Sequence, residues 1–459
     1  MLNIRTIIGI GSKNQATGKV HGAALGDDDV AYVKTQLGFH PDDKFVVPKE
    51  CYDYFKDCVP RGQEAEDKWN KLYAEYQKKF PEEAADLKRR MEGKLREGWE
   101  KDLPTKDQLP KEAIPTRKAS GIAVQALVPK DKTFVAGSAD LLESTFVNYK
   151  DQVEFQNPAG GLGEYSGRQI RYGIREHAMV AIGNGLAAFQ KGMTIPIMST
   201  FFMFWLYAAP AARMSALQGL RFIGIATHDA IGIGEDGPTH QPIALAHFYR
   251  GLPGLNFVRP ADAEETLGAW ILALKDADHP SLFALSRQAL PLLEGTDRNQ
   301  VSKGAYPVYG PENPQITLIA TGAEVSRAIE VAKLLEKDSN RVRVVSMPSQ
   351  EHFDRQPKEY RRSVLPSTSL IVAIEAWGSL GWARYAHAGA HMHTFGMSAP
   401  AGTLYDFFGF KPDNLAKKIT NWSSGFKKGD GYELPGVGEF EELLLGIQPD
   451  HHSPIPYKV

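Results

Sequence analysis

Two stretches of this sequence place ionisable side chains where catalysis could use them. In the first, 171-RYGIREHAMVAIGNGLAAFQKG-192, Arg175, Glu176 and His177 stand at the entrance of a segment that becomes almost wholly apolar. A carboxylate buried among apolar side chains is costly unless it is paired or neutralised. Glu176 is therefore either satisfied by Arg175 or held protonated so that it can pass a proton to a ligand. The residues alone leave both alternatives open.

The second stretch, 226-ATHDAIGIGEDGPTHQP-242, gathers histidines and carboxylates in a glycine-rich loop. It follows the apolar pattern RFIGIAT, which predicts a strand over 221–227. Open parallel sheets bind ligands at the carboxyl ends of their strands, and loops on rigid scaffolds often carry catalytic groups. Such residues suit proton transfer and hydroxyl recognition, and an ordinary polar turn is the alternative. The side chains concerned are His228, Asp229, Glu235, Asp236 and His240.

An aromatic stretch, 199-STFFMFWLYAAPAARMSAL-217, follows the strand pattern TIPIM. Phe201, Phe204 and Tyr207 recur in it at every third position. Periodicity alone favours core packing for these rings. The sharper alternative is an aromatic wall that holds a flat heterocycle.

The elements that must position these residues form two alternating strand and helix blocks, which indicate an α/β fold of two successive parallel sheets covered by helices. One helix is predicted over 263–275, with Asp262 as its N-cap and Glu265 completing a capping box. The boundary between the blocks is expected at 299–315. Strands of the first block are expected at 133–137, 194–198, 221–227, 256–260 and 281–286, and of the second at 316–322, 341–347 and 369–377.

Residues 1–105 form a leader ahead of these blocks. A short apolar strand is expected from Ile4 to Ile10. Residues 61–102 are strongly charged and carry apolar side chains at helical spacing, interrupted at Pro81. The pattern predicts a helical arm whose charges form a solvated face.

The composition is that of an ordinary soluble protein. The chain has 459 residues, of which 42% are hydrophobic and 24% charged, and a net charge of -2. This balance argues against nucleic acid or an anionic membrane as a partner. Cys51 and Cys58 fit no disulfide framework, metal motif or redox motif. No apolar run is long enough to span a membrane and no signal peptide is recognisable, so a cytoplasmic location is expected.

Three motifs that could suggest other chemistry are not supported by their surroundings. Gly9-Ile10-Gly11 lacks the rest of a dinucleotide fingerprint, and Gly429-Asp430-Gly431 lacks the downstream Asn of a diphosphate–metal motif. His387 and His391 have helical spacing, with His393 nearby, but no Cys or carboxylate adjoins them in sequence. Packing or surface roles are favoured, and no metal ligands are predicted in this chain.

The motifs GIREHAM, STFFMFWLYAAPA and GEDGPTHQP, in this order and spacing, resemble the transketolase family. Within that family, the segment STFFMFWLYAAPAARM is most similar to the fungal dihydroxyacetone synthases, which are also called formaldehyde transketolases. The resemblance implies three segments: 1–110, the end of a diphosphate domain plus a charged helical linker; 111–300, a pyrimidine-binding domain; and 312–459, a C-terminal domain. Further matching motifs are VHGAAL, TRKAS, GSADL, RPAD and ALSRQ.

Membership would imply thiamine diphosphate as cofactor and transfer of a two-carbon ketol unit from a ketose to an aldehyde, the chemistry of the pentose phosphate reactions. Glu176 would bond the cofactor's aminopyrimidine ring at N1′ and so activate it. The cofactor would stabilise the carbanion, while the protein would orient the cofactor and remove water from around it. The residues that match the family's cofactor contacts are Glu176, Phe201, Phe204, Tyr207 and Asp140.

The resemblance also assigns roles near the reacting carbon and the substrate. His240 and His21 match catalytic histidines of the family, alongside Glu176. Asp236 matches a group that reads sugar hydroxyls, and an Arg fork suits a phosphate. The residues that match the family's phosphate contacts are Arg117, Ser144, His228 and Arg287.

Two departures from the family pattern matter. After SADL the family usually has Thr-Pro-Ser-Asn, whereas this chain has Leu142-Glu143-Ser144-Thr145. Glu143 brings a negative charge beside an expected phosphate contact, so an uncharged acceptor such as formaldehyde becomes an alternative to a sugar phosphate. The other departure is that most of the family's first domain, with its metal motif, is expected to be missing.

The chain is therefore expected to supply half of a site. Mg²⁺ or Ca²⁺ would bind only with a partner chain that carries the diphosphate domain, in a homodimer or a heteromer. A non-catalytic truncated homologue that acts as a dimerising or regulatory partner is one alternative. A β-type subunit of a pyruvate dehydrogenase-like complex is another, and TRKAS, GSADL and ALSRQ speak against it. A peroxisomal location would fit a dihydroxyacetone synthase, but Tyr-Lys-Val at the end is not Ser-Lys-Leu.

Overall fold

The computed structural model describes residues 2–436 and 438–445. Its chain divides into two compact units, one up to Ala85 and one from Asp86 onward. The first unit is built from helices and loops within its described residues. The second unit contains two six-stranded sheets and a short hairpin.

The first unit confirms the helical arm and corrects the expected strand. Residues 4–10 form an exposed extended segment and a turn instead of a strand. A strand needs a neighbour that pairs its N–H and C=O groups, and the described part of this unit offers none. Pro81 begins a new helix, as predicted. The helices are η1 (Gly18–Val20), α1 (Asp27–Gln36), α2 (Lys49–Phe55), α3 (Cys58–Lys79) and α4 (Pro81–Met91), which runs across the division between the units.

The first sheet of the second unit is parallel throughout, with the order β2-β1-β3-β4-β6-β5. Every residue of β3, β4, β5 and β6 is buried, as expected for strands covered on both faces. The five predicted strands are present with shifted ends, and β2 was missed because it is too short to show a pattern. The strands are β1 (Phe134–Ser138), β2 (Gln169–Arg171), β3 (Ile195–Phe201), β4 (Ile223–Thr227), β5 (Asn256–Val258) and β6 (Ser281–Leu285).

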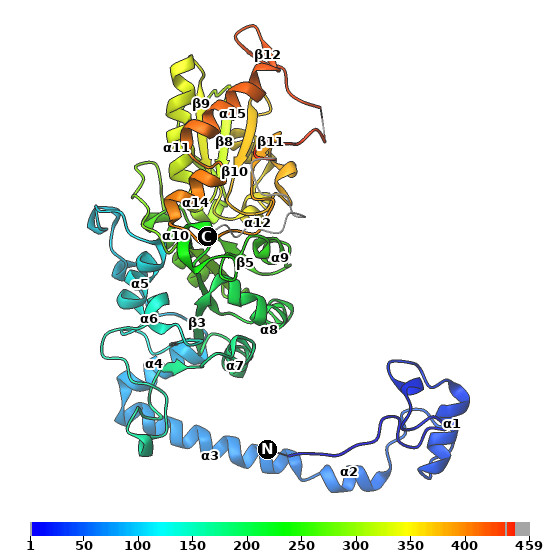
Figure 1. Ribbon diagram of the computed structural model, residues 1–459. Coiled ribbons are helices and arrows are strands. Elements are labelled where there is room, and N and C mark those ends of the chain that lie inside the picture. The colour runs from blue at the N-terminus through cyan, green and yellow to red at the C-terminus, as the bar shows by residue number, and fades with distance from the viewer. Residues whose placement is uncertain (1, 437, 446–459) are drawn as a thin grey trace. The chain divides into compact units, whose positions relative to one another are not determined.

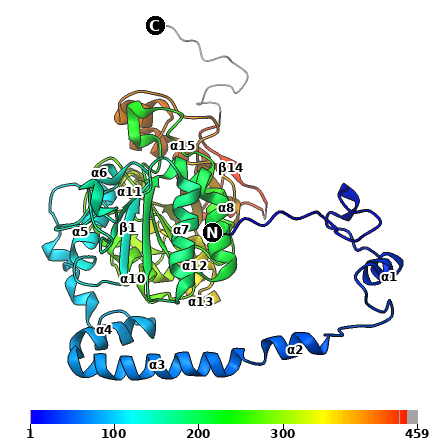
Figure 2. The ribbon, with the colours of Figure 1, turned by 90° about the horizontal axis from the view of Figure 1, so that it is seen from below.

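Helices cover both faces of this sheet (Figures 1 and 2). On one face α5 (Thr116–Leu127) packs beside α10 (Ala263–Lys275), and on the other α7 (Glu176–Phe189) packs beside α8 (Trp205–Gln218). Alternate side chains of one strand enter different cores: Ile197 lies in the α5/α10 core and Met198 in the α7/α8 core. Shorter elements between the strands are α6 (Leu142–Thr145), η5 (Phe202–Phe204), η6 (Ile231–Asp236) and α9 (Leu245–Arg250).

The start of α10 confirms most of the predicted capping box. Asp262 Oδ1 accepts a hydrogen bond from Glu265 N at 3.0 Å, as an N-cap should. The Glu265 carboxylate reaches one residue further back than predicted, because its Oε2 accepts from Ala261 N at 2.7 Å. Its Oε1 accepts from the Tyr306 hydroxyl at 2.7 Å, so the cap also ties the first sheet to the second.

The second sheet is mixed rather than purely parallel. Its order is β14-β11-β10-β8-β9-β7, and β7 pairs antiparallel with β9. The expected boundary at 299–315 therefore contributes an edge strand, which its length and its Pro307 concealed. The strands are β7 (Tyr306–Tyr309), β8 (Ile316–Ala320), β9 (Val342–Ser346), β10 (Leu370–Ile374), β11 (Ala388–Ala390) and β14 (Glu441–Glu442), with the hairpin β12 (Lys427–Lys428) and β13 (Gly431–Tyr432).

The histidines of this region lie at the two ends of a strand, not in a helix: His387 directly precedes β11 and His391 and His393 follow it. His391 comes directly after β11, is fully buried and contacts Glu442 at 3.1 Å, while His393 contacts the same carboxylate at 3.3 Å. The packing role expected for them agrees with this arrangement. The helices around the second sheet are α11 (Glu324–Leu335), α12 (Gln350–Asp354), α13 (Lys358–Val364), α14 (Ala401–Phe407) and α15 (Pro412–Ser424).

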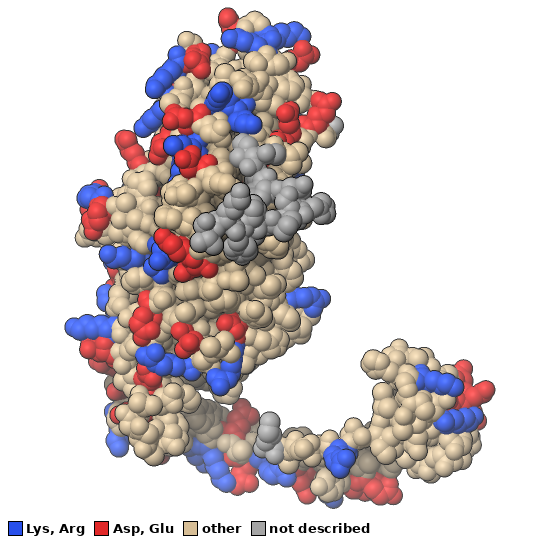
Figure 3. Space-filling view, in the orientation of Figure 1, with Lys and Arg blue, Asp and Glu red and all other residues tan. Residues whose placement is uncertain are grey.

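The surface is mixed in charge. Acidic and basic side chains are interspersed over the face drawn in Figure 3, in keeping with the net charge of -2. Among the described residues, no helix has both the length and the apolar character needed to cross a bilayer.

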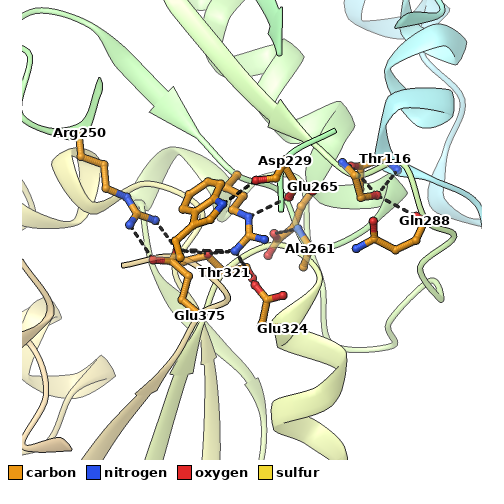
Figure 4. A network of polar contacts seen from close by, with 12 residues as sticks. Thr116, Asp229, Arg250, Ala261, Glu265, Gln288, Thr321, Glu324 and Glu375 are labelled. Carbon is orange, nitrogen blue, oxygen red and sulfur yellow. Dashed lines mark hydrogen bonds and ion pairs between the residues drawn. The ribbon is translucent and has the colours of Figure 1, made fainter. Parts of the chain in front are cut away.

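A buried arginine joins the two sheets. Arg259, just after β5, is fully buried and pairs with Asp229 at 2.9 Å and with Glu324 at 2.5 Å. Its Nη1 also donates to Thr321 Oγ1 at 2.9 Å, and Glu375 lies 3.7 Å away. Asp229 follows β4 of the first sheet. The other three partners belong to the second sheet and its helices: Thr321 follows β8, Glu324 begins α11 and Glu375 follows β10 (Figure 4). The carboxyl edges of the two sheets therefore meet at this guanidinium.

Arg259→Met tests this junction. Removal of the cation leaves buried carboxylates without their partner, so we expect the variant to lose about 3–5 kcal/mol of unfolding free energy in urea denaturation. The control is Arg355→Met, whose ion pair with Glu351 is partly exposed, and which should change stability by about 1 kcal/mol or less. Equal effects of the two substitutions would contradict the assigned role of Arg259.

The Glu265 carboxyl gives the stability a defined pH dependence. Burial, reinforced by nearby Asp262, raises the pKa of Glu265 from 4.5 to about 7. The folded state thus favours the protonated acid, and this contribution is full below pH 4.5 and lost as the pH rises through about 7. We expect Glu265→Gln to remove that decline in unfolding free energies measured at a series of pH values. Glu330→Gln, at an exposed position of α11, should keep it.

Candidate active site

The predicted site residues gather at the carboxyl edge of the first sheet. Asp140 follows β1, Phe201 ends β3, His228 follows β4 and Arg287 follows β6. Because the sheet is parallel, these strand ends share one edge. β2 and β3 lie on opposite sides of β1, which makes the gap between β1 and β3 a topological switch point, where open α/β sheets bind ligands.

His228 is held as a neutral imidazole. Its backbone is left-handed, with φ at 62°, an uncommon conformation for a residue other than glycine. Its Nδ1 lies 2.8 Å from Thr227 Oγ1, and its ring stacks on Phe201 with centroids 3.5 Å apart. Burial, with the charges of Arg117 and Arg287 in addition, lowers the pKa of His228 to about 2.

Arg117 stands beside His228 without a carboxylate bound to it. Its Nη1 donates to the Ser144 carbonyl at 2.8 Å and lies 3.5 Å from His228 Nε2, while its buried Nε has no hydrogen-bond partner within the described residues. Burial and the charge of Arg287 lower the pKa of Arg117, while Asp236 opposes the shift. Two guanidinium groups that repel each other near a neutral imidazole suit an anion.

Ser144 and Glu143 take roles that their types did not reveal. Ser144 contacts Arg117 through its backbone carbonyl, so its hydroxyl is left for a ligand. Glu143 is 74% exposed in its side chain and lies 3.7 Å from Arg171. Arg171 also pairs with Glu154 at 2.5 Å. The negative charge of Glu143 is thus matched by a cation outside the Arg117 cluster.

The aromatic rings separate into a core set and an exposed set. Phe202 and Trp205 are fully buried, whereas Tyr207 is 63% exposed. Phe201 and Phe204 stack at 5.8 Å, and Phe204 and Tyr207 follow at 6.3 Å. Phe202 and Trp205 therefore pack in the core. Of the predicted trio, Phe201 is also buried, at 9% exposed, whereas Phe204 and Tyr207 are more open, which favours the aromatic wall for these two rings.

His240 closes one end of this wall. Its ring meets Phe204 edge-on at 5.2 Å and Phe201 at 6.1 Å, and its Nδ1 lies 2.9 Å from Thr239 Oγ1. The loop that carries it turns at Gly234 and Gly237, whose φ values of 81° and 75° suit glycine. Asp236, at the end of η6, is exposed on the same loop.

Glu176 is buried with no internal partner. It is the first residue of α7 and is 7% exposed. Arg175 does not pair with it, because the Arg175 Nη1 donates to the Tyr172 carbonyl at 2.9 Å. No described side chain forms a hydrogen bond or ion pair with the Glu176 carboxyl, so of the two alternatives for this acid, satisfaction by Arg175 is wrong. The helix begins at the carboxyl edge because α7 runs back along the sheet to β3.

Some residues fall outside the cluster or were missed. His21 belongs to the first unit, where it is exposed after η1. Asp140 is exposed, with φ at 62°. Thr227, which orients the His228 ring, and Phe146, whose ring lies 5.5 Å from the Arg117 guanidinium, gave no motif signal in sequence. The described residues contain no group of three or more His, Cys, Asp or Glu side chains that could hold a metal ion.

Comparison with known families matches most of the chain. Residues 112–292 match the transketolase pyrimidine binding domain, residues 304–411 a transketolase-like C-terminal domain, and residues 1–96 the transketolase thiamine diphosphate binding domain. The match to the first of these models includes nearly all of the edge cluster.

Individual relatives agree with these matches. Transketolase 1 of Saccharomyces cerevisiae is 46% identical over 94% of this chain and 63% of its own length. The dihydroxyacetone synthase of Candida boidinii is 43% identical over 93% of this chain and 61% of its own length. The chain thus spans about three fifths of the curated relatives it matches, and the identities do not single out the dihydroxyacetone synthases.

Solved structures extend the comparison to the fold. A transketolase from Pichia stipitis in complex with sedoheptulose 7-phosphate superposes with a TM-score of 0.85 at 42% identity, over 91% of this chain and 62% of that chain. A split-gene transketolase described as an inactive β4 tetramer shares the fold at 23% identity, with a TM-score of 0.52 over 98% of its own chain. On the agreement of motifs, relatives and fold, the chain belongs to the transketolase family.

Proposed function

We propose that this chain supplies the pyrimidine-binding half of a thiamine diphosphate site and that a second polypeptide completes it. The reaction would be transfer of a two-carbon ketol unit from a ketose to an aldehyde. The observation that carries the proposal is Glu176, a residue only 7% exposed whose carboxyl has no hydrogen-bond or ion-pair partner among the described residues, at the edge where such sheets bind ligands. Such a group calls for a ligand atom that shares its proton.

The residues present fit the cofactor's aminopyrimidine ring. Glu176 would hold a proton at ring atom N1′. Phe204 and Tyr207 offer stacked, partly open faces for the ring, and Phe201 adjoins them. Asp140 and His21 are assigned to the cofactor and the reacting carbon by family resemblance. Thiamine diphosphate, when bound, supplies carbanion stabilisation, while these side chains orient the ring and exclude water.

The diphosphate and its cation would be bound by the partner. We assign Mg²⁺ or Ca²⁺ to a diphosphate domain on that second chain, because the phosphates carry charge that a hard cation must offset. Exposed apolar side chains of α7 and α8 suit such an interface, in a homodimer or a heteromer. These side chains are Ile182 and Phe189 of α7 and Leu206 and Leu217 of α8.

The substrate side of the site favours a phosphorylated sugar. Arg117 lies beside the neutral His228 and Ser144, and the charge of Arg287 acts on both Arg117 and His228, which suits a phosphate. Glu143 is matched by Arg171 and so weighs less against phosphate than its sequence position suggested. Asp236 and His240, on the neighbouring loop, would read hydroxyl groups and move a proton. Formaldehyde, the acceptor of a formaldehyde transketolase, is the second candidate for the aldehyde acceptor. The segment STFFMFWLYAAPAARM favours it. A cytoplasmic location is part of the same proposal.

Glu176→Gln provides the direct test of catalysis. The wild-type chain is combined with a separately produced transketolase diphosphate domain, thiamine diphosphate and Mg²⁺, and ketol transfer between phosphorylated sugars is measured. Because glutamine cannot exchange a proton with N1′, we expect Glu176→Gln to lower the rate by about 10²-fold or more. Glu330→Gln, at an exposed position of α11, is the matched control and should leave the rate unchanged. Full activity of Glu176→Gln would refute the proposal.

The alternative of a non-catalytic homologue makes a different prediction about binding. It is motivated by the span of the chain, which covers about three fifths of its curated relatives. For a half-site, we expect calorimetry to record weak thiamine diphosphate binding by the lone chain and tight, Mg²⁺-dependent binding once the diphosphate domain is added. A non-catalytic chain should show the same cofactor affinity with and without that domain, and this result would favour the alternative.

A further inference from the structure

The proposed phosphate site depends on a backbone conformation that its own neighbours do not explain. His228 is left-handed, a conformation that costs a non-glycine residue on the order of 1 kcal/mol or more. Within the first sheet, Thr227 and Phe201 contact only its side chain. They orient the ring, but they do not hold the peptide groups that set its φ angle. A strained residue persists where surrounding contacts fix it.

The contacts that fix this turn come through Asp229. Trp377, which follows β10 of the second sheet, donates its indole N–H to the Asp229 carbonyl at 2.5 Å. Arg259 Nε donates to Asp229 Oδ2 at 2.9 Å. Both donors and Asp229 itself are almost completely buried, so no water competes for these bonds. The residue after His228 is thus held at its carbonyl and at its carboxylate.

Trp377 is itself fixed in place by the junction. Its ring lies 4.1 Å from the Arg259 guanidinium and 5.6 Å from the Phe202 ring. Arg259 is in turn held by Glu324 and Thr321, which belong to the second sheet and its helices (Figure 4). The indole N–H therefore cannot follow the Asp229 carbonyl if the turn relaxes. It defines one position for the peptide between Asp229 and the next residue.

We propose that Trp377 of the second sheet is a positioning residue for substrate anion recognition, which acts through the Asp229 carbonyl to keep His228 in the left-handed conformation that places its imidazole beside Arg117. The inference rests on the proposed function, because it assigns His228 to the phosphate of the substrate. It gives the second sheet a part in recognition beyond packing. Trp377 itself does not contact the anion.

Trp382 offers a matched control within the same network. It is also fully buried and also donates its indole N–H to the network, but to Glu375 Oε2 at 2.8 Å, away from the His228 turn. Replacement of either tryptophan by phenylalanine removes one N–H donor and a similar volume. Only Trp377→Phe frees the Asp229 carbonyl.

The first experiment measures anion binding and needs no catalysis. The full chain, with its histidine rings isotopically labelled, is titrated with inorganic phosphate, and the His228 resonances, assigned with His228→Gln, report the dissociation constant. We expect the wild type and Trp382→Phe to agree, and Trp377→Phe to raise the constant about fivefold, which corresponds to one net hydrogen bond. Urea denaturation confirms that both variants are folded under the titration conditions.

The second experiment separates positioning from a general loss of structure. In the reconstituted ketol transfer, Trp377→Phe should raise KM for a phosphorylated aldehyde acceptor by the same factor. It should leave kcat and the KM of an unphosphorylated hydroxyaldehyde unchanged. A general structural defect would lower kcat and affect both acceptors alike.

Each remaining outcome is decisive. Equal phosphate affinity of Trp377→Phe and the wild type overturns the inference while the proposed function stands, and so does an equal loss in both tryptophan variants. If inorganic phosphate leaves the His228 resonances of the wild type unmoved, the phosphate-reading role of His228 falls, and the inference falls with it. Failure of ketol transfer alongside normal phosphate binding removes only the catalytic proposal.

Discussion

A fully buried guanidinium must be compensated, and the way this chain compensates Arg259 determines how its two sheets are joined. Asp229 of the first sheet and Glu324 of the second both bind it, and Glu375 is shared with Arg250, which pairs with that carboxylate at 2.6 Å. Breaking such a set leaves uncompensated buried charge, so neither sheet keeps its edge intact without the other. Two guanidinium groups face three carboxylates, and burial raises the pKa of Glu324, which favours retention of one proton within the network.

The junction divides the carboxyl edge of the first sheet into two unlike parts. The ends of β4 and β5 face the second sheet and are closed by Trp377 and Arg259. Asp140 follows β1, and Phe201 ends β3. Glu176 begins α7, the helix before β3, and the exposed ring of Tyr207 belongs to α8, the helix after it. The second sheet thus closes one part of this edge, at the ends of β4 and β5.

The groups around Arg117 and His228 leave the Arg117 guanidinium available to an anion. Arg117 donates to a carbonyl and not to a carboxylate, and His228 is kept neutral by burial and by the adjacent guanidinium groups. A neutral imidazole adds a directional hydrogen bond without adding further repulsion between cations. Glu143, whose negative charge was expected beside a phosphate contact, lies 3.7 Å from Arg171 at the surface.

Local patterns were enough to predict the α/β class, the longer strands of both sheets, the helix over 263–275 and the position of His228 at a strand end, whereas the short strands β2, β7, β11 and β14 were missed and Arg287 was assigned only by resemblance. Apolar runs, capping residues and polar groups at strand ends are short-range properties, so one sequence determines them. Tertiary structure alone decided that Arg175 leaves Glu176 unpaired, that β7 joins its sheet antiparallel, and that Trp377 holds a residue 148 positions earlier in the chain. These outcomes depend on which distant groups meet in a buried environment, where an unsatisfied bond or charge is costly, and no local pattern records that meeting.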